Sequence, residues 1–556
     1  MGLRNQAIHY WHTLRHLRPV QVYGRVWFRL WRPKPNLRPA PPRAGLSASW
    51  VLPAQRLPSM LGPRSWLLLN EAGDLDDVGW DGPQREKLWR YNQHYFDDLN
   101  AQDADARLGW HLALVDDWVA NNPPGQGNGW EPYPLSLRVV NWLKWVLRGA
   151  ALSAAAHKSL AVQVRWLMGR LEYHLLGNHL FANAKALVMA GLFFDGPEAD
   201  AWLEQGLHIL EREVPEQLLS DGGHFERSTM YHALVLEDLL DLINASQCFA
   251  ARLSSSQRRQ VTEWPEHAYA LHSWLLDMCH PDGEISLFND AAFDIASSGP
   301  ELDDYARRVL RGVATKITTS LVHLRDSGYV RLTHGPAVAL LDVATVGPDY
   351  LPGHAHADTL SFELSVGGQR VLVNSGTSCY GASAERLRQR GTAAHNTVVI
   401  DRQDSSEVWG GFRVARRAYP FGLHIEQSAE MNATEVHCAH NGYTRLPGKP
   451  IHHRTWRMDS CGLAVTDRVK GANKRAEARF HFHPGVQVRI SSSKVEGSAA
   501  LADGTLVGWQ VDCGQARLEA STWHPRFGHA EPNLCLSVQL EDGFSAIRFN
   551  WQPSKF

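Results

Sequence analysis

The stretch GHAHADTLSFELSVGGQRVLVNSGT, residues 353–377, places His354 and His356 in front of a run with a period of two. Apolar and polar side chains alternate over residues 360–366, which is the pattern of a strand with one face in a core. Gly367-Gly368 then supplies a tight turn before a second apolar run, RVLVN. The stretch therefore predicts an antiparallel β-hairpin with two imidazoles at its entrance.

The period of the apolar residues changes near residue 320. Before it, amphipathic helical stripes run through residues 135–147, 157–175, 180–193 and 225–243. After it, segments such as NTVVI and LCLSVQL alternate as strands do. Helices followed by strands indicate two consecutive domains instead of a wound α/β sheet, and 556 residues exceed what one core supports.

The domain limits follow from this change of period. We place the boundary between residues 315 and 325. The chain then divides into an N-terminal extension that packs as a strap (1–85), a helical domain (86–318) and an antiparallel β domain (319–556). The proline-rich RPKPNLRPAPPRAG after Trp31 fits an extended strap.

Composition excludes several classes of protein. A net charge of −2 and a pI near 7.0 give no reason to expect nucleic-acid or membrane binding. The seven cysteines include no CxxC pair, which is neither a zinc-finger nor a disulfide-scaffold pattern. No secretory signal and no run of about 20 apolar residues is present. We expect a cytoplasmic protein, or a periplasmic one if a leader has been removed.

Two sequence clusters in the helical half carry polar residues where helices begin. Asn178 and His179 follow Gly177, although Gly-Asn is also an ordinary pair of helix-capping residues. Tyr231 and His232 follow the turn DGGHFERS, although a tyrosine there could equally be a core residue whose hydroxyl bonds the backbone. Each cluster therefore has a structural and a functional interpretation.

The third cluster is the hairpin entrance and its continuation. His354, His356 and His395 could bind a metal, since neutral imidazoles are common zinc ligands. Alternatively, His354 belongs to an active site and the other two form a structural pair. Nearby arginines could bind a carboxylate or sulfate, or could simply be solvated. They are Arg386, Arg388 and Arg390.

Read together, the motifs resemble the heparinase II/III-like polysaccharide lyases, a superfamily that also holds alginate and oligoalginate lyases. The motifs are GNHLFANAKAL (177–187), DGGHFERSTMYH (221–232), GHAHADTLSFEL (353–364), LVNSGT (372–377) and RGTAAHNTVVID (390–401). The likeness covers roughly residues 85–420. It implies an α+β multidomain fold, an incomplete (α/α) toroid followed by an antiparallel β-sandwich, with the active site in the cleft between them. The hairpin histidines would project into that cleft.

The resemblance also implies roles in β-elimination from a uronic acid. Asn178 with His179 would neutralise the C5 carboxylate. Tyr231 would protonate the leaving oxygen and, in a syn elimination, would also take the C5 proton. His354 is the second candidate acid or base, and Tyr380 would assist it. No redox or organic cofactor is required. Further candidates for substrate binding are His232, Arg386, Arg390, His224 and Trp130.

One position departs from the family pattern. Family members commonly hold zinc between the second histidine of GHxH, an aspartate in the following strand and the histidine of AHN. Here His356 and His395 match, but Asn374 occupies the aspartate position. A neutral amide is a poorer zinc ligand than a carboxylate. We expect either a structural zinc ion or a pair of imidazoles that Asn374 joins by hydrogen bonds.

Two other functions stay open. A glycoside hydrolase would need two carboxylates across the bond, for which the candidates are Asp221, Glu226, Asp282 and Glu284. A non-catalytic protein that binds or assembles exopolysaccharide is the second. For the lyase, the partner is an acidic polysaccharide or oligosaccharide, such as a glycosaminoglycan, alginate or a capsular uronate. We expect a monomer or a homodimer.

Overall fold

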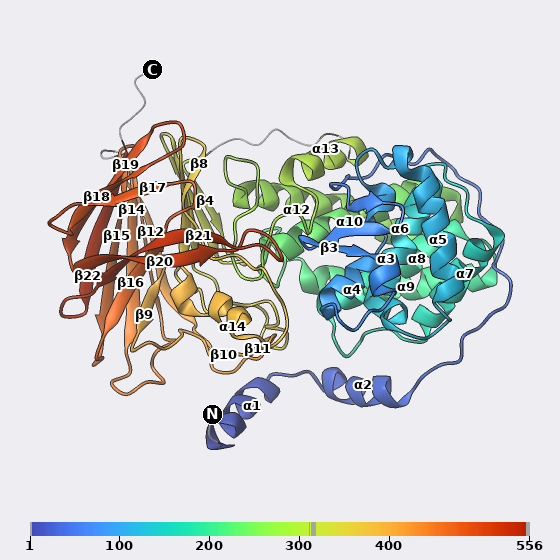
Figure 1. The fold of residues 1–556 in the computed structure, drawn as a ribbon, viewed down its shortest axis with the longest axis horizontal. Helices are drawn as coiled ribbons and strands as arrows, with labels where there is room; N and C mark the ends of the chain where they lie inside the picture. Colours follow the sequence, from blue (N-terminus) through green and yellow to red (C-terminus); the bar gives the residue numbers. More distant parts are fainter. Residues whose placement is uncertain (1–2, 311, 313–318, 429, 431, 552–556) are drawn as a thin grey trace.

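A computed structural model gives the coordinates of the chain and describes all residues except 1–2, 311, 313–318, 429, 431 and 552–556. The first half of the chain forms a helical body and the second half a strand-rich body beside it (Figure 1). The helix α13 ends at Val309, and the strand β4 begins at Leu321. The α+β class is therefore confirmed. Residues 315–318 of the predicted boundary lie outside the described residues.

The helical body is built around helix α8. The described helices of this body are α4 (Lys87–Gln93), α5 (Leu108–Asn121), α6 (Pro132–Leu147), α7 (Ala154–Met168), α8 (Gly177–Phe193), α9 (Pro197–Gln217), α10 (Thr229–Cys248), α11 (Ser255–Thr262), α12 (Trp264–Met278) and α13 (Gly299–Val309). Apart from Asn178 and His179, every residue of α8 is buried. A Cβ at Gly191 would lie 2.5 Å from the backbone nitrogen of Leu203 in α9, so glycine lets the two helices pack closely.

Helix α7 is shorter than its apolar stripe predicts, because it ends at Met168 instead of residue 175. The chain turns there, and the backbone reaches a positive φ at Leu176 and again at Gly177. A side chain at Gly177 would meet Leu351 at 2.5 Å. Gly177 therefore starts α8 in a conformation and a space that favour glycine, instead of capping α7.

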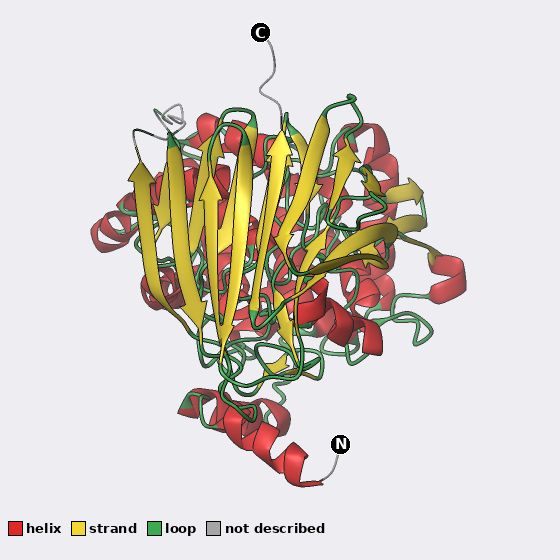
Figure 2. Ribbon diagram, turned by 90° about the vertical axis from the view of Figure 1, so that its left-hand side faces the viewer, coloured by secondary structure: helices red, strands yellow, loops and turns green. Residues whose placement is uncertain are grey.

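The strand-rich body contains three antiparallel sheets whose apolar faces share one core. The five-stranded sheet runs β4 (Leu321–Leu324), β5 (Tyr329–His334), β6 (Ala337–Asp342), β7 (Phe362–Val366) and β8 (Gln369–Leu372). The four-stranded sheet runs β20 (Gln515–Trp523), β21 (Glu531–Gln539), β16 (Ala476–His481) and β9 (Val398–Ile400). The eight-stranded sheet (Figure 2) runs β12 (Pro420–Ser428), β13 (Ala433–His440), β14 (Ile451–Met458), β15 (Gly462–Lys470), β22 (Phe544–Trp551), β19 (Leu506–Cys513), β18 (Glu496–Ala500) and β17 (Gln487–Ile490).

The predicted hairpin is strands β7 and β8, which pair antiparallel. Gly367 and Gly368 have φ of 58° and 81°, the left-handed conformation that a two-residue hairpin turn needs. Unlike a half-exposed strand, β7 is buried on both faces. Its polar face meets the helical body, where Glu363 accepts a 2.8 Å hydrogen bond from His280. The alternation of the sequence therefore marks an interface between the two bodies instead of a solvated face.

The N-terminal extension forms elements of its own. It contains α1 (Leu3–Leu14), α2 (Pro19–Leu30), a small sheet of β1 (Met60–Gly62), β2 (Ser65–Leu68) and β3 (Glu71–Asp74), and α3 (Leu75–Val78). The proline-rich segment after α2 is largely irregular and runs along the helical body (Figure 1). Among the described residues, no helix has both the length and the apolar character needed to cross a membrane.

Candidate active site

A cavity of about 620 Å³ lies where the helical body meets loops of the strand-rich body. Its wall includes Asn178 at the start of α8, Tyr231 at the start of α10 and Tyr380 in the loop after β8. These are three of the five residues predicted for catalysis. The other two, His179 and His354, lie beside the cavity without lining it.

Tyr231 is held by the N-terminal cap of α10. The hydroxyl of Ser228 accepts a 3.2 Å hydrogen bond from the Tyr231 amide and donates to the Asp290 carbonyl at 2.5 Å. The Tyr231 hydroxyl lies 3.0 Å from that of Tyr380. Burial, and the proximity of other phenols, raise the pKa of Tyr231 well above its ordinary value, and burial likewise raises that of Tyr380. Both phenols therefore keep their protons at neutral pH, as a general acid must.

His354 packs behind Tyr231 instead of projecting into the open cavity as expected. The two rings have centroids 3.9 Å apart. The His354 Nδ1 lies 2.9 Å from a carboxylate oxygen of Asp290, and its Nε2 lies 3.5 Å from a carboxylate oxygen of Glu226. The imidazole is thus fixed from both ends. When the neutral His354 ring carries its proton on Nδ1 and donates it to Asp290, Nε2 has a lone pair and no proton.

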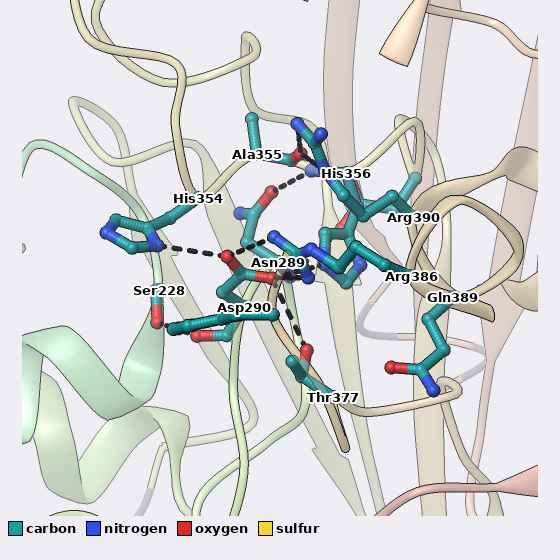
Figure 3. Close-up of polar contacts among 12 residues, drawn as sticks. Ser228, Asn289, Asp290, His354, Ala355, His356, Thr377, Arg386, Gln389 and Arg390 are labelled. Atoms are coloured by element: carbon teal, nitrogen blue, oxygen red, sulfur yellow. Dashed lines mark hydrogen bonds and ion pairs between the residues drawn. The ribbon is translucent and has the colours of Figure 1, made fainter. Parts of the chain in front are cut away.

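Asp290 is the centre of this network (Figure 3). Its buried carboxylate accepts hydrogen bonds from both terminal nitrogens of Arg386 and from His356 Nε2 at 2.8 Å, in addition to His354. Thr377 donates at 3.4 Å. Burial on its own would raise the pKa of Asp290, but Arg386 and the two histidines lower it well below its ordinary value. Asp290 is therefore a buried anion that positions groups from both bodies.

Asp290 was not among the residues predicted from the sequence. It lies in the loop after α12, only a few residues beyond Asp282 and Glu284, which were considered as hydrolase carboxylates. No period or motif in that loop distinguishes it. The preceding residue, Asn289, also reaches the strand-rich body, where its side-chain oxygen accepts a 3.0 Å hydrogen bond from the backbone nitrogen of His356.

Asn178 and His179 lie together at the N-terminus of α8. Asn178 is half-buried and lines the cavity, while the ring of His179 packs 4.5 Å from that of Tyr133, another lining residue. Burial lowers the pKa of His179, but the Glu172 carboxylate, 3.3 Å from Nδ1, outweighs it and raises the pKa above its ordinary value. His179 is thus biased toward the cationic form that would stabilise a nearby carboxylate.

The structure gives no support to the five residues predicted to bind substrate. None of them lines the cavity, and each is buried. Arg386 is paired with Asp290, Arg390 donates to the Ala355 carbonyl at 2.9 Å, and Trp130 packs among core tryptophans. His224 and His232 bond protein atoms inside the helical body. These side chains bond or pack inside the protein, although His224 Nδ1 has no hydrogen-bond partner among the described residues.

The predicted metal residues form a buried chain. His356 Nδ1 lies 3.3 Å from His395 Nε2, and His395 Nδ1 lies 3.3 Å from the Asn374 side-chain oxygen. Burial lowers the pKa of His356 to about 4, so its ring is neutral at pH 7. Asn374 approaches the nitrogen of His395 that faces away from His356, and within the described residues no three acidic, histidine or cysteine side chains form a metal-binding group. The donor set therefore does not fit the expected zinc site.

Much of the cavity wall is charged, which was not predicted from the sequence. Each lysine and arginine among the described lining residues is paired with at least one carboxylate. The pairs are Arg56 with Asp97 and Glu237, Lys144 with Glu237 and Asp241, Lys185 with Asp238 and Asp241, and Arg526 with Asp294. Further lining carboxylates are Asp98, Glu284, Glu301 and Asp304. The wall is therefore acidic overall.

The carboxylates considered for a hydrolase do not face each other across this cavity. Only Glu284 lines it. Asp221 accepts hydrogen bonds from the backbone of the loop before β5, Asp282 is paired with Arg370, and Glu226 is buried beside His354. An acid and a base on opposite sides of a glycosidic bond are therefore not provided by this set.

Comparisons with known proteins agree with the order of the two bodies. Residues 100–302 match the family model "Heparinase II/III N-terminus", and residues 316–551 match "Heparinase II/III-like, C-terminal". The solved structure titled "Crystal Structure of Heparinase III" superposes with a TM-score of 0.64 over 84% of this chain and 76% of that chain, at 18% identity. The two share the toroid and β-sandwich fold.

Among curated proteins, a heparin-sulfate lyase of Bacteroides stercoris is 25% identical over 252 residues, which cover 42% of this chain and 37% of that protein. This chain thus matches well under half of that lyase. FtsZ-localized protein C of Caulobacter vibrioides is 24% identical over 473 residues, 78% of this chain and 76% of that protein.

The Asp290 network predicts a pH-dependent loss of stability in the Asp290→Asn variant. Removing the anion leaves Arg386 buried without its partner, which costs about 3–5 kcal/mol. Because the native pKa of Asp290 is depressed, its contribution is complete above the unfolded value of about 3.9 and is lost as the pH falls further. Urea unfolding should therefore show the full deficit at pH 7 and a smaller one at pH 3.5.

The matched control is Asp294→Asn. Asp294 also pairs with an arginine, Arg526, but both side chains are partly exposed, so the loss should stay below about 1 kcal/mol. Equal losses in the two variants at pH 7 would contradict the central role of Asp290.

Proposed function

We propose that this chain, which belongs to the heparinase II/III-like superfamily, is a polysaccharide lyase. It would cleave a uronate-containing polymer by β-elimination. The observation that carries the proposal is the pair of protonated phenols, Tyr231 and Tyr380, with hydroxyls 3.0 Å apart at the edge of the cavity. Asn178 shares that cavity. An amide and a phenol can therefore reach one sugar ring.

The charge on the carboxylate of the substrate uronate must be neutralised before the C5 proton can leave. While the carboxylate keeps its full charge, that proton is far too weakly acidic for a side chain to remove. We assign neutralisation to the Asn178 amide and to His179, whose pKa is raised by Glu172. They stabilise the charge that spreads onto the carboxylate in the enolate-like transition state.

Two groups then move the protons. His354 takes the C5 proton on Nε2, because Asp290 holds the tautomer in which this nitrogen carries no proton. The electron pair forms the C4–C5 double bond, the bond from C4 to the leaving oxygen breaks, and Tyr231 protonates that oxygen. Substrate binding has to bring C5 within reach of Nε2, which lies behind the Tyr231 ring. The raised pKa of Tyr231 disfavours the alternative in which its phenolate is the base.

The charge of the cavity wall indicates which polymer fits. A chain with sulfates would need arginines or lysines free to pair with them, whereas the lysines and arginines that line this cavity are already paired and are outnumbered by the lining carboxylates. We therefore propose an unsulfated polymer in which uronates alternate with uncharged or amino-bearing sugars.

A non-catalytic function is the second candidate. It is favoured by the similarity to FtsZ-localized protein C, which covers more of both chains than the similarity to the lyase of Bacteroides stercoris. Retention of the amide, the phenols and the imidazole argues for catalysis, because binding alone needs no acid or base.

The His356–His395–Asn374 chain is proposed to be held by hydrogen bonds without a metal ion. If the Asn374 amide turns its NH2 toward His395 Nδ1, it donates there, His395 Nε2–H donates to His356, and His356 Nε2–H donates to Asp290. The turn also gives a partner to the Asn374 nitrogen, which is otherwise buried without one.

The lyase proposal predicts an unsaturated uronate product that absorbs in the ultraviolet. With a cleavable polymer, Tyr231→Phe and His354→Ala should each lower kcat by at least about 100-fold, because each removes an acid or base. Tyr173→Phe is the control, since Tyr173 is an exposed tyrosine outside the cavity. Full activity in Tyr231→Phe would refute the assigned acid, and a wild-type protein inactive on every uronate polymer would favour the non-catalytic function.

The substrate proposal predicts a preference within one backbone. Unsulfated chondroitin and chondroitin sulfate differ only in sulfation, so a panel should include this pair beside hyaluronan, alginate and heparan sulfate. We expect kcat/KM to be at least about tenfold higher for the unsulfated polymer, equivalent to one unfavourable charge contact. A higher value for the sulfated form would contradict the proposal even if lyase activity is found.

The metal proposal predicts the zinc content of the purified protein. Protein prepared without added zinc should contain far less than one zinc per chain by elemental analysis. The Asn374→Asp variant, which adds a carboxylate ligand, should bind more. One zinc ion per wild-type chain would show that the hydrogen-bonded chain is incorrect.

A further inference from the structure

The charge of the chain is unevenly distributed along the sequence. The first 70 residues contain eleven arginines and lysines and no aspartate or glutamate, although the net charge of the whole chain is −2. The balance over the whole chain, which gave no reason to expect a membrane, therefore conceals a strongly basic N-terminal segment. The two helices α1 and α2 lie in that segment.

Both helices expose apolar stripes to solvent. On α2, Val22, Tyr23, Val26, Trp27 and Leu30 fall on one face at helical spacing, and Trp27 is 63% exposed and Leu30 80% exposed. On α1, the exposed face carries Tyr10, Trp11 and Leu14, with Trp11 67% exposed. Apolar side chains this large normally lie in a core or an interface, so two adjacent exposed stripes call for a partner.

Arginines border the apolar face of α2. Arg25 and Arg29 lie on the same side of the helix, and Arg32 follows its end. In the part of the chain that the structure describes, no carboxylate lies within ion-pair distance of these three, unlike Arg18, which pairs with Glu216. Aromatic and aliphatic residues on one face, with cations along its edge, are the pattern of a helix that lies in a membrane interface.

The opposite faces fasten both helices to the protein. On α2, the Gln21 side chain donates to the Tyr350 carbonyl at 3.1 Å, and Phe28 packs 4.2 Å from His174. On α1, Thr13 accepts a 3.1 Å hydrogen bond from Trp409. Figures 1 and 2 show the two helices along one edge of the molecule, outside both bodies. Both helices are therefore attached to the protein before any partner binds.

We propose that α1 and α2 form a membrane-docking surface, defined by the exposed side chains of Tyr10, Trp11, Leu14, Tyr23, Val26, Trp27 and Leu30 and by Arg25, Arg29 and Arg32. The partner is the headgroup layer of a bilayer that contains anionic lipids. The apolar side chains insert at the level of the acyl boundary, and the arginines pair with lipid phosphates. The helices lie on the membrane and do not cross it.

Charge favours lipid over a second copy of this chain. A symmetric dimer through this surface would place the arginines of one copy beside those of the other, because the same patch contacts itself. An anionic bilayer instead offers negative charge and apolar depth at once.

The test is flotation of the full chain with vesicles of phosphatidylcholine alone and of phosphatidylcholine with 30% phosphatidylglycerol. The wild type should bind the anionic vesicles and bind less at 0.5 M salt, where screening is stronger. Neutralising two cations in Arg25→Gln/Arg29→Gln should lower the partition coefficient about 30-fold. Trp27→Ser/Leu30→Ser should abolish binding, while polymer cleavage in solution is unchanged if the chain is a lyase.

Leu506→Ser is the matched control. Leu506 is 60% exposed on β19, far from α1 and α2 in the fold, so its variant should bind like the wild type. Equal binding of the wild type to both kinds of vesicle, or unchanged binding in the two double variants, would overturn the proposal. So would sedimentation of the wild type as a dimer that Trp27→Ser/Leu30→Ser dissociates, without any vesicle binding.

Discussion

A buried carboxylate helps to fix the two bodies relative to each other. Asp290 comes from a loop of the helical body and accepts hydrogen bonds from Arg386, His354 and His356 of the strand-rich body. Removing a buried charge from its partners costs several kcal/mol, so a sliding movement of one body over the other is opposed at this point. Tyr380 lies in the loop just before the short helix α14 (Ala384–Arg390), which carries Arg386, and its hydroxyl contacts that of Tyr231 across the interface.

The fold was predictable where the sequence signal is local. The hairpin follows from Gly367-Gly368 and the alternation before it, and the order of helices and strands follows from the change of period. The end of α7 was not predictable in this way, because the apolar stripe continues past Met168 while the backbone departs from helix. An apolar stripe indicates which residues are buried, but buried residues also occur in irregular backbone, so the stripe does not show where a helix ends.

The site was predictable only where motifs mark it. The resemblance selected Asn178, Tyr231 and Tyr380, and all three line the cavity. It could not select Asp290, whose partners are distant in sequence and meet it only after folding. Arg386 was assigned to the substrate from its charge alone, because a sequence shows a cation without the carboxylate that already pairs with it.

The net charge of the whole chain conceals how unevenly the charged residues are distributed. A net charge of −2 looks neutral, yet the chain combines an N-terminal segment without acidic residues with a cavity whose cations are outnumbered by carboxylates. These regions favour opposite partners. The exposed arginines of α2 attract dense negative charge such as a lipid surface, whereas the acidic wall repels it and admits an anionic polymer only when its charges are sparse. A heavily sulfated chain would therefore be drawn to the outside of this protein and kept from its cavity.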